Sequence, residues 1–131
     1  MSQTNVERVE RITREWAAGN WSGGAELIDP DVVLTARVPE GSVISEGQDA
    51  IGRFMREFLS QWERYWIDPA EFVDVGDKIL ASGHQYGIGT TSRIKIREPW
   101  YGTFTFRDDR VVAMSFTPDR EEALAAAGLA E

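Results

Sequence analysis

The feature that most constrains the fold is a run of strand-like segments in the second half of the chain. Residues 78–88, 92–97, 100–107 and 110–117 are short segments with alternating side-chain character, and short turns separate them. Strands that follow one another so closely pair most simply in an antiparallel sheet. Such a sheet needs a covering layer on at least one face, so the rest of the chain has to supply it.

Helical patterns before these strands provide that layer. Residues 5–19 and 48–62 place apolar side chains at helical spacing, with charged residues on the other side. Between these two helices we predict a short helix over 22–28, a strand over 32–38 and a glycine-containing loop over 39–47.

The segment after the 48–62 helix is predicted to be extended, and the chain is predicted to end in a helix. Residues 65–75 are rich in aromatic and β-branched side chains, with a break at Pro69. Asp119 and Glu122 have the spacing of a reciprocal capping pair and predict a terminal helix over 120–127.

Length and composition fit one acidic domain. With 131 residues, 42% of them hydrophobic, the chain has room for one core, and we predict a single α+β domain over residues 1–131. The 14 basic and 22 acidic residues give a net charge of −8. This charge argues against nucleic acid or an anionic membrane surface as the main partner, because both require a basic patch.

The absence of cysteine excludes several kinds of site. No disulfide, thiolate metal site or cysteine nucleophile can form, and with a single histidine we expect neither a metal nor another cofactor. No apolar segment reaches the roughly 18 residues of a membrane span, and the first residues lack a signal-peptide pattern. We therefore expect a cytoplasmic protein.

Four segments, taken in order, resemble one superfamily. They are Trp16-Ala-Ala-Gly-Asn-Trp21, Glu46-Gly-Gln-Asp-Ala-Ile51-Gly-Arg-Phe54, Val75-Gly-Asp-Lys78, and Phe104-Thr-Phe-Arg-Asp-Asp-Arg-Val-Val-Ala-Met-Ser-Phe116, which continues to Leu129. Their order and spacing resemble the nuclear transport factor 2-like superfamily, and within it the SnoaL-like domains, over essentially the whole chain. The resemblance implies a cone: a strongly curved antiparallel sheet wrapped around a long helix, cystatin-like, with a pocket at the open end.

Side-chain alternation on this cone predicts the residues of the pocket. A small apolar or aromatic molecule is the expected ligand, and the alternative is that the same side chains simply pack as core. Glycine within a strand gives up a side chain where something can approach, which favours a void at Gly102. The predicted lining is Ile12, Trp16, Phe54, Phe58 and Trp62 from the helices, with Trp100, Gly102, Phe104, Met114 and Phe116 from the strands.

The single histidine is the leading candidate for chemistry. In the 78–88 strand the bulkier alternate set includes His84 and Tyr86, so we predict that both lie on the pocket wall. Histidine titrates near neutrality and can transfer a proton. Glu98 shares its face with Trp100 and is the predicted partner of His84 at the rim; the alternative is a solvated rim charge.

The opposite face of the last strands predicts a homodimer. It carries small and hydroxylated side chains with few charges, and the resemblance implies pairing through this outer face of the sheet. The predicted interface consists of Tyr101, Thr103, Thr105, Ala113, Ser115 and Thr117.

The sequence is compatible with more than one function. Ketosteroid isomerases of the superfamily use a tyrosine and two acids, and the matching positions here hold Ile12, Thr35 or Ala36, and Gly102, so that mechanism is not expected. Three interpretations are left. The domain is an acid–base enzyme of the isomerase, cyclase or hydratase type centred on His84, a non-catalytic ligand-binding or accessory domain, or a dimerisation module with a filled cone.

Overall fold

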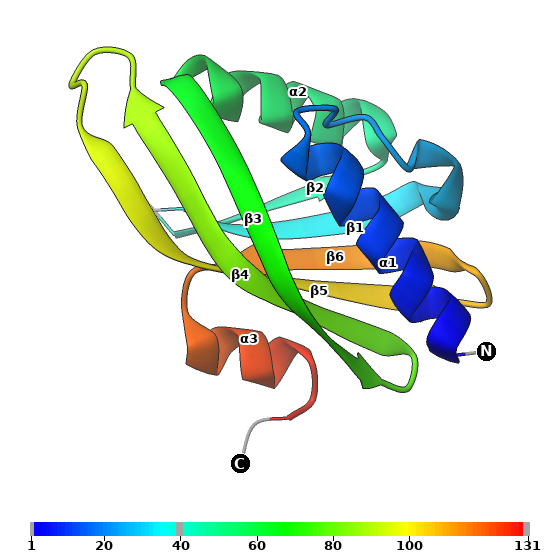
Figure 1. Cartoon of the computed structure of the whole chain (residues 1–131). Coiled ribbons are helices and arrows are strands. Elements are labelled where there is room, and N and C mark those ends of the chain that lie inside the picture. Colours follow the sequence, from blue (N-terminus) through cyan, green and yellow to red (C-terminus); the bar gives the residue numbers. More distant parts are fainter. Residues whose placement is uncertain (1, 39–40, 130–131) are drawn as a thin grey trace.

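The computed structural model describes residues 2–38 and 41–129. Within them, helices and strands follow in the order expected of an α+β domain (Figure 1). The elements are α1 (Ser2–Ala17), the 3-10 turn η1 (Ala25–Leu27), β1 (Ile28–Val38), β2 (Gly41–Glu46), α2 (Gln48–Ser60), β3 (Trp62–Val75), β4 (Lys78–Gly89), β5 (Lys95–Arg107), β6 (Arg110–Thr117) and α3 (Arg120–Ala126).

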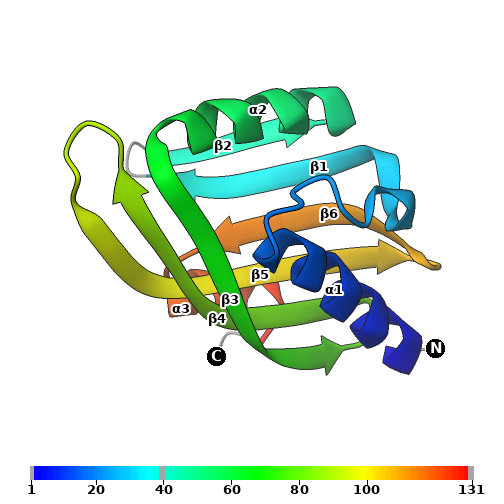
Figure 2. The same cartoon turned by 45° about the horizontal axis from the view of Figure 1, so that its top comes forward.

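The strands form one strongly curved sheet in the order β2-β1-β6-β5-β4-β3. Figures 1 and 2 show α1 and α2 on its concave face, while α3 lies on the other side. The predicted α+β fold with a curved sheet around a long helix is confirmed. One pairing differs from the prediction, because the last strand inserts between β1 and β5 and therefore runs parallel to β1.

Two segments of the first half differ from their predictions. Residues 41–46, predicted as a loop, form the edge strand β2, which pairs antiparallel with β1. Glycines at both ends of this segment are typical of a loop, which is why the strand was not predicted. β1 is the only strand that pairs with it. The helix predicted over 22–28 is reduced to the single turn η1, and Ile28 already belongs to β1.

Prolines interrupt neither of the two long strands. Pro99 lies inside β5, so the predicted segments 92–97 and 100–107 are one strand from Lys95 onward. Pro69 lies inside β3, where a bulge between Pro69 and Glu71 absorbs the irregularity. β3 is the edge of the sheet, where a missing N–H costs least.

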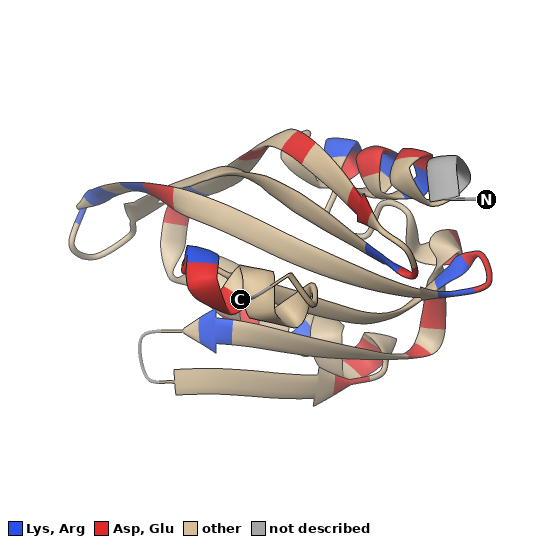
Figure 3. Ribbon diagram, turned by 90° about the horizontal axis from the view of Figure 1, so that it is seen from below, with Lys and Arg blue, Asp and Glu red and all other residues tan. Residues whose placement is uncertain are grey.

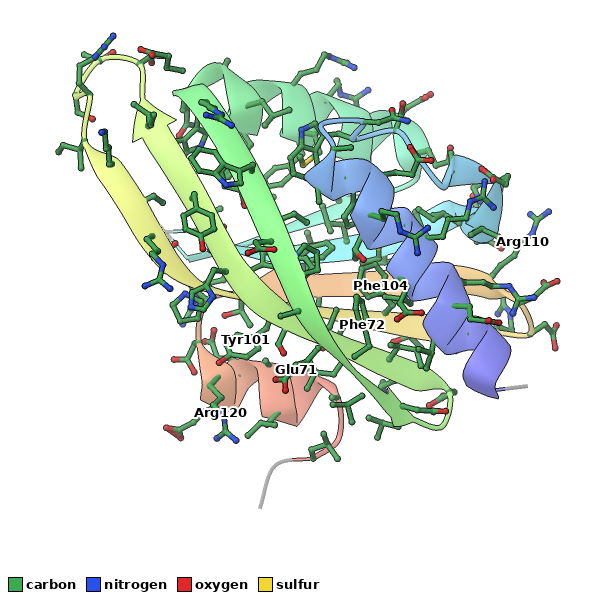
Figure 4. The ribbon with its side chains drawn as sticks, viewed as in Figure 1. Glu71, Phe72, Tyr101, Phe104, Arg110 and Arg120 are labelled. Atoms are coloured by element: carbon green, nitrogen blue, oxygen red, sulfur yellow. The ribbon has the colours of Figure 1, made fainter. Side chains whose placement is uncertain are left out.

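The main core lies between α1 and the concave face of the sheet. Val9, Ile12, Ile79, Phe104 and Val111 have no exposed surface. Phe104 sits beneath α1 in Figure 4, whereas Tyr101, three residues earlier on the opposite face, lies beside α3. No helix among the described residues combines the length and apolarity needed to cross a membrane.

The terminal helix α3 covers part of the outer face. Asp119 caps it by accepting a hydrogen bond from the Glu122 backbone N–H at 3.1 Å. The reciprocal half of the predicted capping pair is wrong. The Glu122 carboxylate instead accepts a hydrogen bond from the Thr117 hydroxyl at 2.7 Å and pairs with Arg37 at 2.6 Å.

Removing this cap gives a first prediction. Asp119→Ala is expected to lower the free energy of unfolding by about 1 kcal/mol, since it leaves a helix-terminal N–H without its acceptor. Asp119→Asn keeps an acceptor oxygen and is expected to stay close to wild type. Urea unfolding measures both variants, and equal losses in the two would contradict the capping role.

Candidate functional site

A cavity of about 140 Å³ lies between the concave face of the sheet, α1 and α2. Apolar side chains make up most of its wall, and aromatic rings predominate among them. Its lining residues are Trp16, Trp21, Leu34, Ala36, Arg37, Val38, Ile51, Phe54, Met55, Phe58, Tyr65, Ile67, Gln85, Trp100, Met114, Phe116, Thr117 and Pro118.

A wider hollow of about 470 Å³ adjoins this cavity between the segment 19–25 and α2. The two spaces have wall residues in common and therefore adjoin one another. The shared residues are Trp16, Trp21, Ile51, Met55 and Met114.

Most of the predicted ligand contacts lie along the cavity. Trp16, Phe54, Phe58, Trp100, Met114 and Phe116 line it.

Four residues predicted for the pocket lie in the packing instead. Ile12 and Phe104 are fully buried in the core, and the Phe104 ring lies 5.9 Å from Trp16. Trp62 packs beside Phe58 and Tyr65, with ring centroids 6.1 and 5.8 Å away. Gly102 leaves no void, because a Cβ there would lie 2.8 Å from the Phe116 ring.

The prediction that His84 and Tyr86 lie on the cavity wall is wrong. The alternation of β4 is the reverse of the predicted one: Ile79 is in the main core, while Leu80 contacts α3 on the outer face. On that outer face Tyr86 stacks on Trp66 at 5.1 Å, and the His84 ring is 6.4 Å from Tyr86. The sheet therefore separates the only histidine from the cavity.

Small residues on β4 explain this reversal. Gly83 and Gly87 belong to the inner set, where close neighbours require them. A Cβ at Gly87 would lie 2.6 Å from the Trp62 ring, and one at Gly83 would lie 2.1 Å from the Asp68 carbonyl oxygen. The bulkier set faces outward because the inner side of this strand is already occupied.

A polar chain on the cavity wall was missed by sequence reasoning. The Tyr65 hydroxyl donates to Gln85 Oε1 at 2.6 Å, and Gln85 Nε2 donates to Glu98 Oε1 at 3.1 Å and to the Pro99 carbonyl at 3.3 Å. Tyr65 and Gln85 line the cavity. Glu98 thus lies on the inner face as predicted, but its neighbour is Gln85 and not His84. The sequence signal for this polar chain was the other set of alternating residues in β4, the one that ends in Gln85 and Gly87.

Arg37 is the other charged residue beside the cavity. Its guanidinium pairs with Glu122 at 2.6 Å, next to Thr117. This pair joins the rim of the cavity to α3. Within residues 2–38 and 41–129, no cluster of three acidic or histidine side chains is placed to hold a metal ion.

A model of the SnoaL-like domain matches residues 9–114. The chain belongs to the SnoaL-like domain family. Comparison with curated protein sequences gave no match.

Solved structures share the fold of this SnoaL-like domain. An NTF2-like protein of unknown function from Burkholderia pseudomallei has a TM-score of 0.77 at 19% identity, covering 93% of this chain and 95% of that one. TerC, co-crystallised with polyporic acid, has a TM-score of 0.76 at 18% identity, with 96% and 97% covered. A protein described as a SnoaL-like polyketide cyclase from Jannaschia sp. has a TM-score of 0.76 at 21% identity, with 98% and 94% covered.

The buried phenol gives a prediction for the alkaline range. Burial, and then the charge of Glu98, raises the pKa of Tyr65 well above its usual range. In the unfolded chain this phenol ionises near pH 10. The stability it contributes is therefore fully present below about pH 10 and is lost as the pH rises from there towards the folded pKa.

Absorbance titration measures this effect. The difference between the wild-type and Tyr65→Phe titration curves reports the ionisation of Tyr65 alone. This difference curve should show no ionisation step near pH 10 while the protein is folded. A step there would mean that the phenol is accessible to water, contrary to its position in the structure.

Proposed function

We propose that this SnoaL-like domain binds a small, predominantly apolar and aromatic molecule in the cavity. The observation that carries the proposal is the wall itself, where rings from α1, α2 and three strands surround an interior space of about 140 Å³. Apolar, concave spaces with a few polar groups are the usual form of small-molecule sites. TerC, which has the same fold, was co-crystallised with polyporic acid, and this supports the proposal.

The geometry best supports a domain that binds its ligand without catalysing a reaction. His84 lies on the other face of the sheet, so it cannot reach a molecule in the cavity. Tyr65 keeps its proton near neutral pH, because a phenol ordinarily ionises near pH 10 and burial raises its pKa further, and the Gln85 amide does not titrate. The geometry therefore does not support acid–base catalysis centred on His84.

Proton transfer by Glu98 is the second candidate. Its support is the 3.1 Å contact with Gln85, which places a carboxylate one hydrogen bond from the cavity, and a cyclase-like neighbour of the same fold. If Glu98 acts on the ligand, Glu98→Gln should co-purify with a molecule different from that held by wild type. The same molecule in both proteins would exclude this role.

Blocking the cavity tests the binding proposal. Ala36 is buried and lines the cavity, so Ala36→Phe would project a ring into it. Ala125→Phe adds the same ring on the exposed side of α3, away from the cavity, and is the matched control. Mass spectrometry of organic extracts should find a co-purified aromatic molecule in wild type and Ala125→Phe, and at least about tenfold less in Ala36→Phe. Equal amounts in all three would overturn the proposal.

We also propose that two copies of the domain pair through the outer face of the sheet. The predicted interface needs revision, because Thr103 and Thr117 are buried within the chain and Tyr101 packs on α3. In β1, β2, β5 and β6 the charged residues lie towards the strand ends, which leaves the centres of these strands uncharged (Figure 3). The revised interface is Val33, Thr35, Ile44, Thr105, Ala113 and Ser115.

A charge in this interface should separate the copies. Light scattering is expected to give a dimer for wild type and a monomer for Ala113→Arg. Ala125→Arg, on the exposed side of α3, should remain dimeric. A wild-type monomer at micromolar concentration would contradict the pairing.

A further inference from the structure

The polar part of the cavity wall has a fixed hydrogen-bond direction. Gln85 Nε2 lies 3.1 Å from the Glu98 carboxylate and 3.3 Å from the Pro99 carbonyl. Both neighbours are acceptors only, so the nitrogen of the amide has to face them. Rotating the amide by half a turn would place its oxygen against two other oxygens and break both contacts. The Gln85 oxygen must therefore point towards Tyr65.

This orientation determines what Tyr65 can offer a ligand. The contact from Tyr65 Oη to Gln85 Oε1 is short, at 2.6 Å, and the amide oxygen has no proton to give. The phenol proton is thus committed to Gln85. The Tyr65 oxygen can still accept a hydrogen bond from another group. Because Tyr65 and Gln85 both line the cavity, this hydrogen bond lies on the cavity wall.

We propose that the Tyr65 oxygen is the acceptor for a hydrogen-bond donor on the ligand, so that the molecule bound is an apolar ring compound carrying a hydroxyl or amine group. This inference rests on the proposed function, since it assumes that the cavity is occupied. A ligand that offers only an acceptor, such as an ether or ketone oxygen, would face the Tyr65 oxygen without a proton between them and would be disfavoured.

The charges around the cavity favour the same class of ligand. Glu98 places negative charge behind Gln85, which disfavours a carboxylate or phenolate ligand on this wall. Among the described residues, Arg37 is the only basic side chain of the lining, and Glu122 at 2.6 Å compensates its charge.

The ring of Tyr65 is held rigidly enough to make this selection. Phe58 contacts it edge-on with centroids 4.9 Å apart, and the ring centroids of Trp21 and Trp62 each lie 5.8 Å away. Tyr65→Phe keeps this packing and removes only the oxygen. The phenol oxygen can therefore be tested separately from the fold.

Fluorescence titration with three probes of similar size shows whether the cavity prefers a ligand with a hydrogen-bond donor, one without a donor, or an anion. 2-Naphthol offers a donor, 2-methoxynaphthalene offers the same ring without one, and 2-naphthoate carries an anion. We expect wild type to bind 2-naphthol about tenfold more tightly than 2-methoxynaphthalene, as one additional hydrogen bond allows, and 2-naphthoate most weakly. Tyr65→Phe should reduce the naphthol preference to less than about threefold and leave 2-methoxynaphthalene unchanged.

Two further variants complete the test. Gln85→Leu frees the Tyr65 proton and should also remove the naphthol preference. Tyr86→Phe deletes a phenol oxygen on the outer face and should keep it. A wild type that binds both neutral probes equally, or a preference that persists in Tyr65→Phe, would overturn the inference while leaving the binding function intact. If neither neutral probe binds wild type, or if both bind Ala36→Phe equally well, the proposed function fails as well.

Discussion

Phe104→Ala is expected to lower the free energy of unfolding by about 3–5 kcal/mol, the usual cost of removing a large buried ring. Phe104 has no exposed surface and lies in the centre of the main core. Its ring packs against Trp16 at 5.9 Å and against Phe116 at 5.8 Å. The loss combines the transfer of the ring with the space it leaves, because the surrounding sheet and helix can close that space only in part.

Urea unfolding measures this effect, with Phe58→Ala as the matched control. Phe58 is only partly buried and already faces the cavity, so its removal should cost clearly less than the removal of Phe104. Since Trp16 and Phe116 both line the cavity, Phe104→Ala should also weaken probe binding. Equal losses of stability in the two variants would show that Phe104 is not at the centre of the core.

The parts of the fold that sequence predicted well are those with distinct alternation or capping. In β5, alternation correctly placed Trp100 and Phe104 on the inner face of the sheet, where both belong to the main core, but only Trp100 also lines the cavity that was predicted for both. A bulge next to Phe106 breaks the simple alternation into β6, so Val111 is buried on the inner side although Ala113, two residues later, lies opposite Thr105 on the outer face. Local pattern is reliable until a bulge changes which face a residue occupies.

The site was harder to predict because its residues depend on partners far away in sequence. The rule that bulky side chains face inward failed on β4, where the inner positions that follow Ile79 hold only alanine, glycine and one glutamine. The space that Gly83 and Gly87 leave is taken by the Asp68 backbone and the Trp62 ring. No periodicity in β4 itself contains this information.

The same reversal hid the polar group that matters most in the cavity. The reversed alternation predicted His84 on the inner face and Gln85 on the outer face, so the predicted proton-transfer residue lies on the wrong side of the sheet. Tyr65 was treated only as the start of an extended segment. Its pairing with Gln85 comes from the β3–β4 register, which puts Ile67 opposite Gln85 and Tyr65 opposite Gly87. A register-based model of the hairpin would have brought Tyr65 and Gln85 together.

Gly83→Ala is expected to be among the most destabilising single-atom additions in the domain, costing about 1–3 kcal/mol or more. The new Cβ would lie 2.1 Å from the Asp68 carbonyl oxygen and 2.9 Å from the Pro69 Cα. Both are backbone atoms next to the β3 bulge, so no side-chain rotation relieves the clash. Relief requires β3 to move away from β4 at the point where the two strands curve.

The matched control is the same substitution at Gly52, within α2. A Cβ there would meet only the Arg56 side chain at 3.5 Å, and alanine is favoured over glycine inside a helix, so Gly52→Ala should gain about 0.5–1 kcal/mol. Urea unfolding should therefore give changes of opposite sign. A displaced β3 also moves Tyr65 relative to Gln85, so Gly83→Ala should lose the preference for 2-naphthol that Gly52→Ala retains. If Gly83→Ala were as stable as wild type and kept that preference, the close approach of β3 and β4 would not be what positions the polar wall of the cavity.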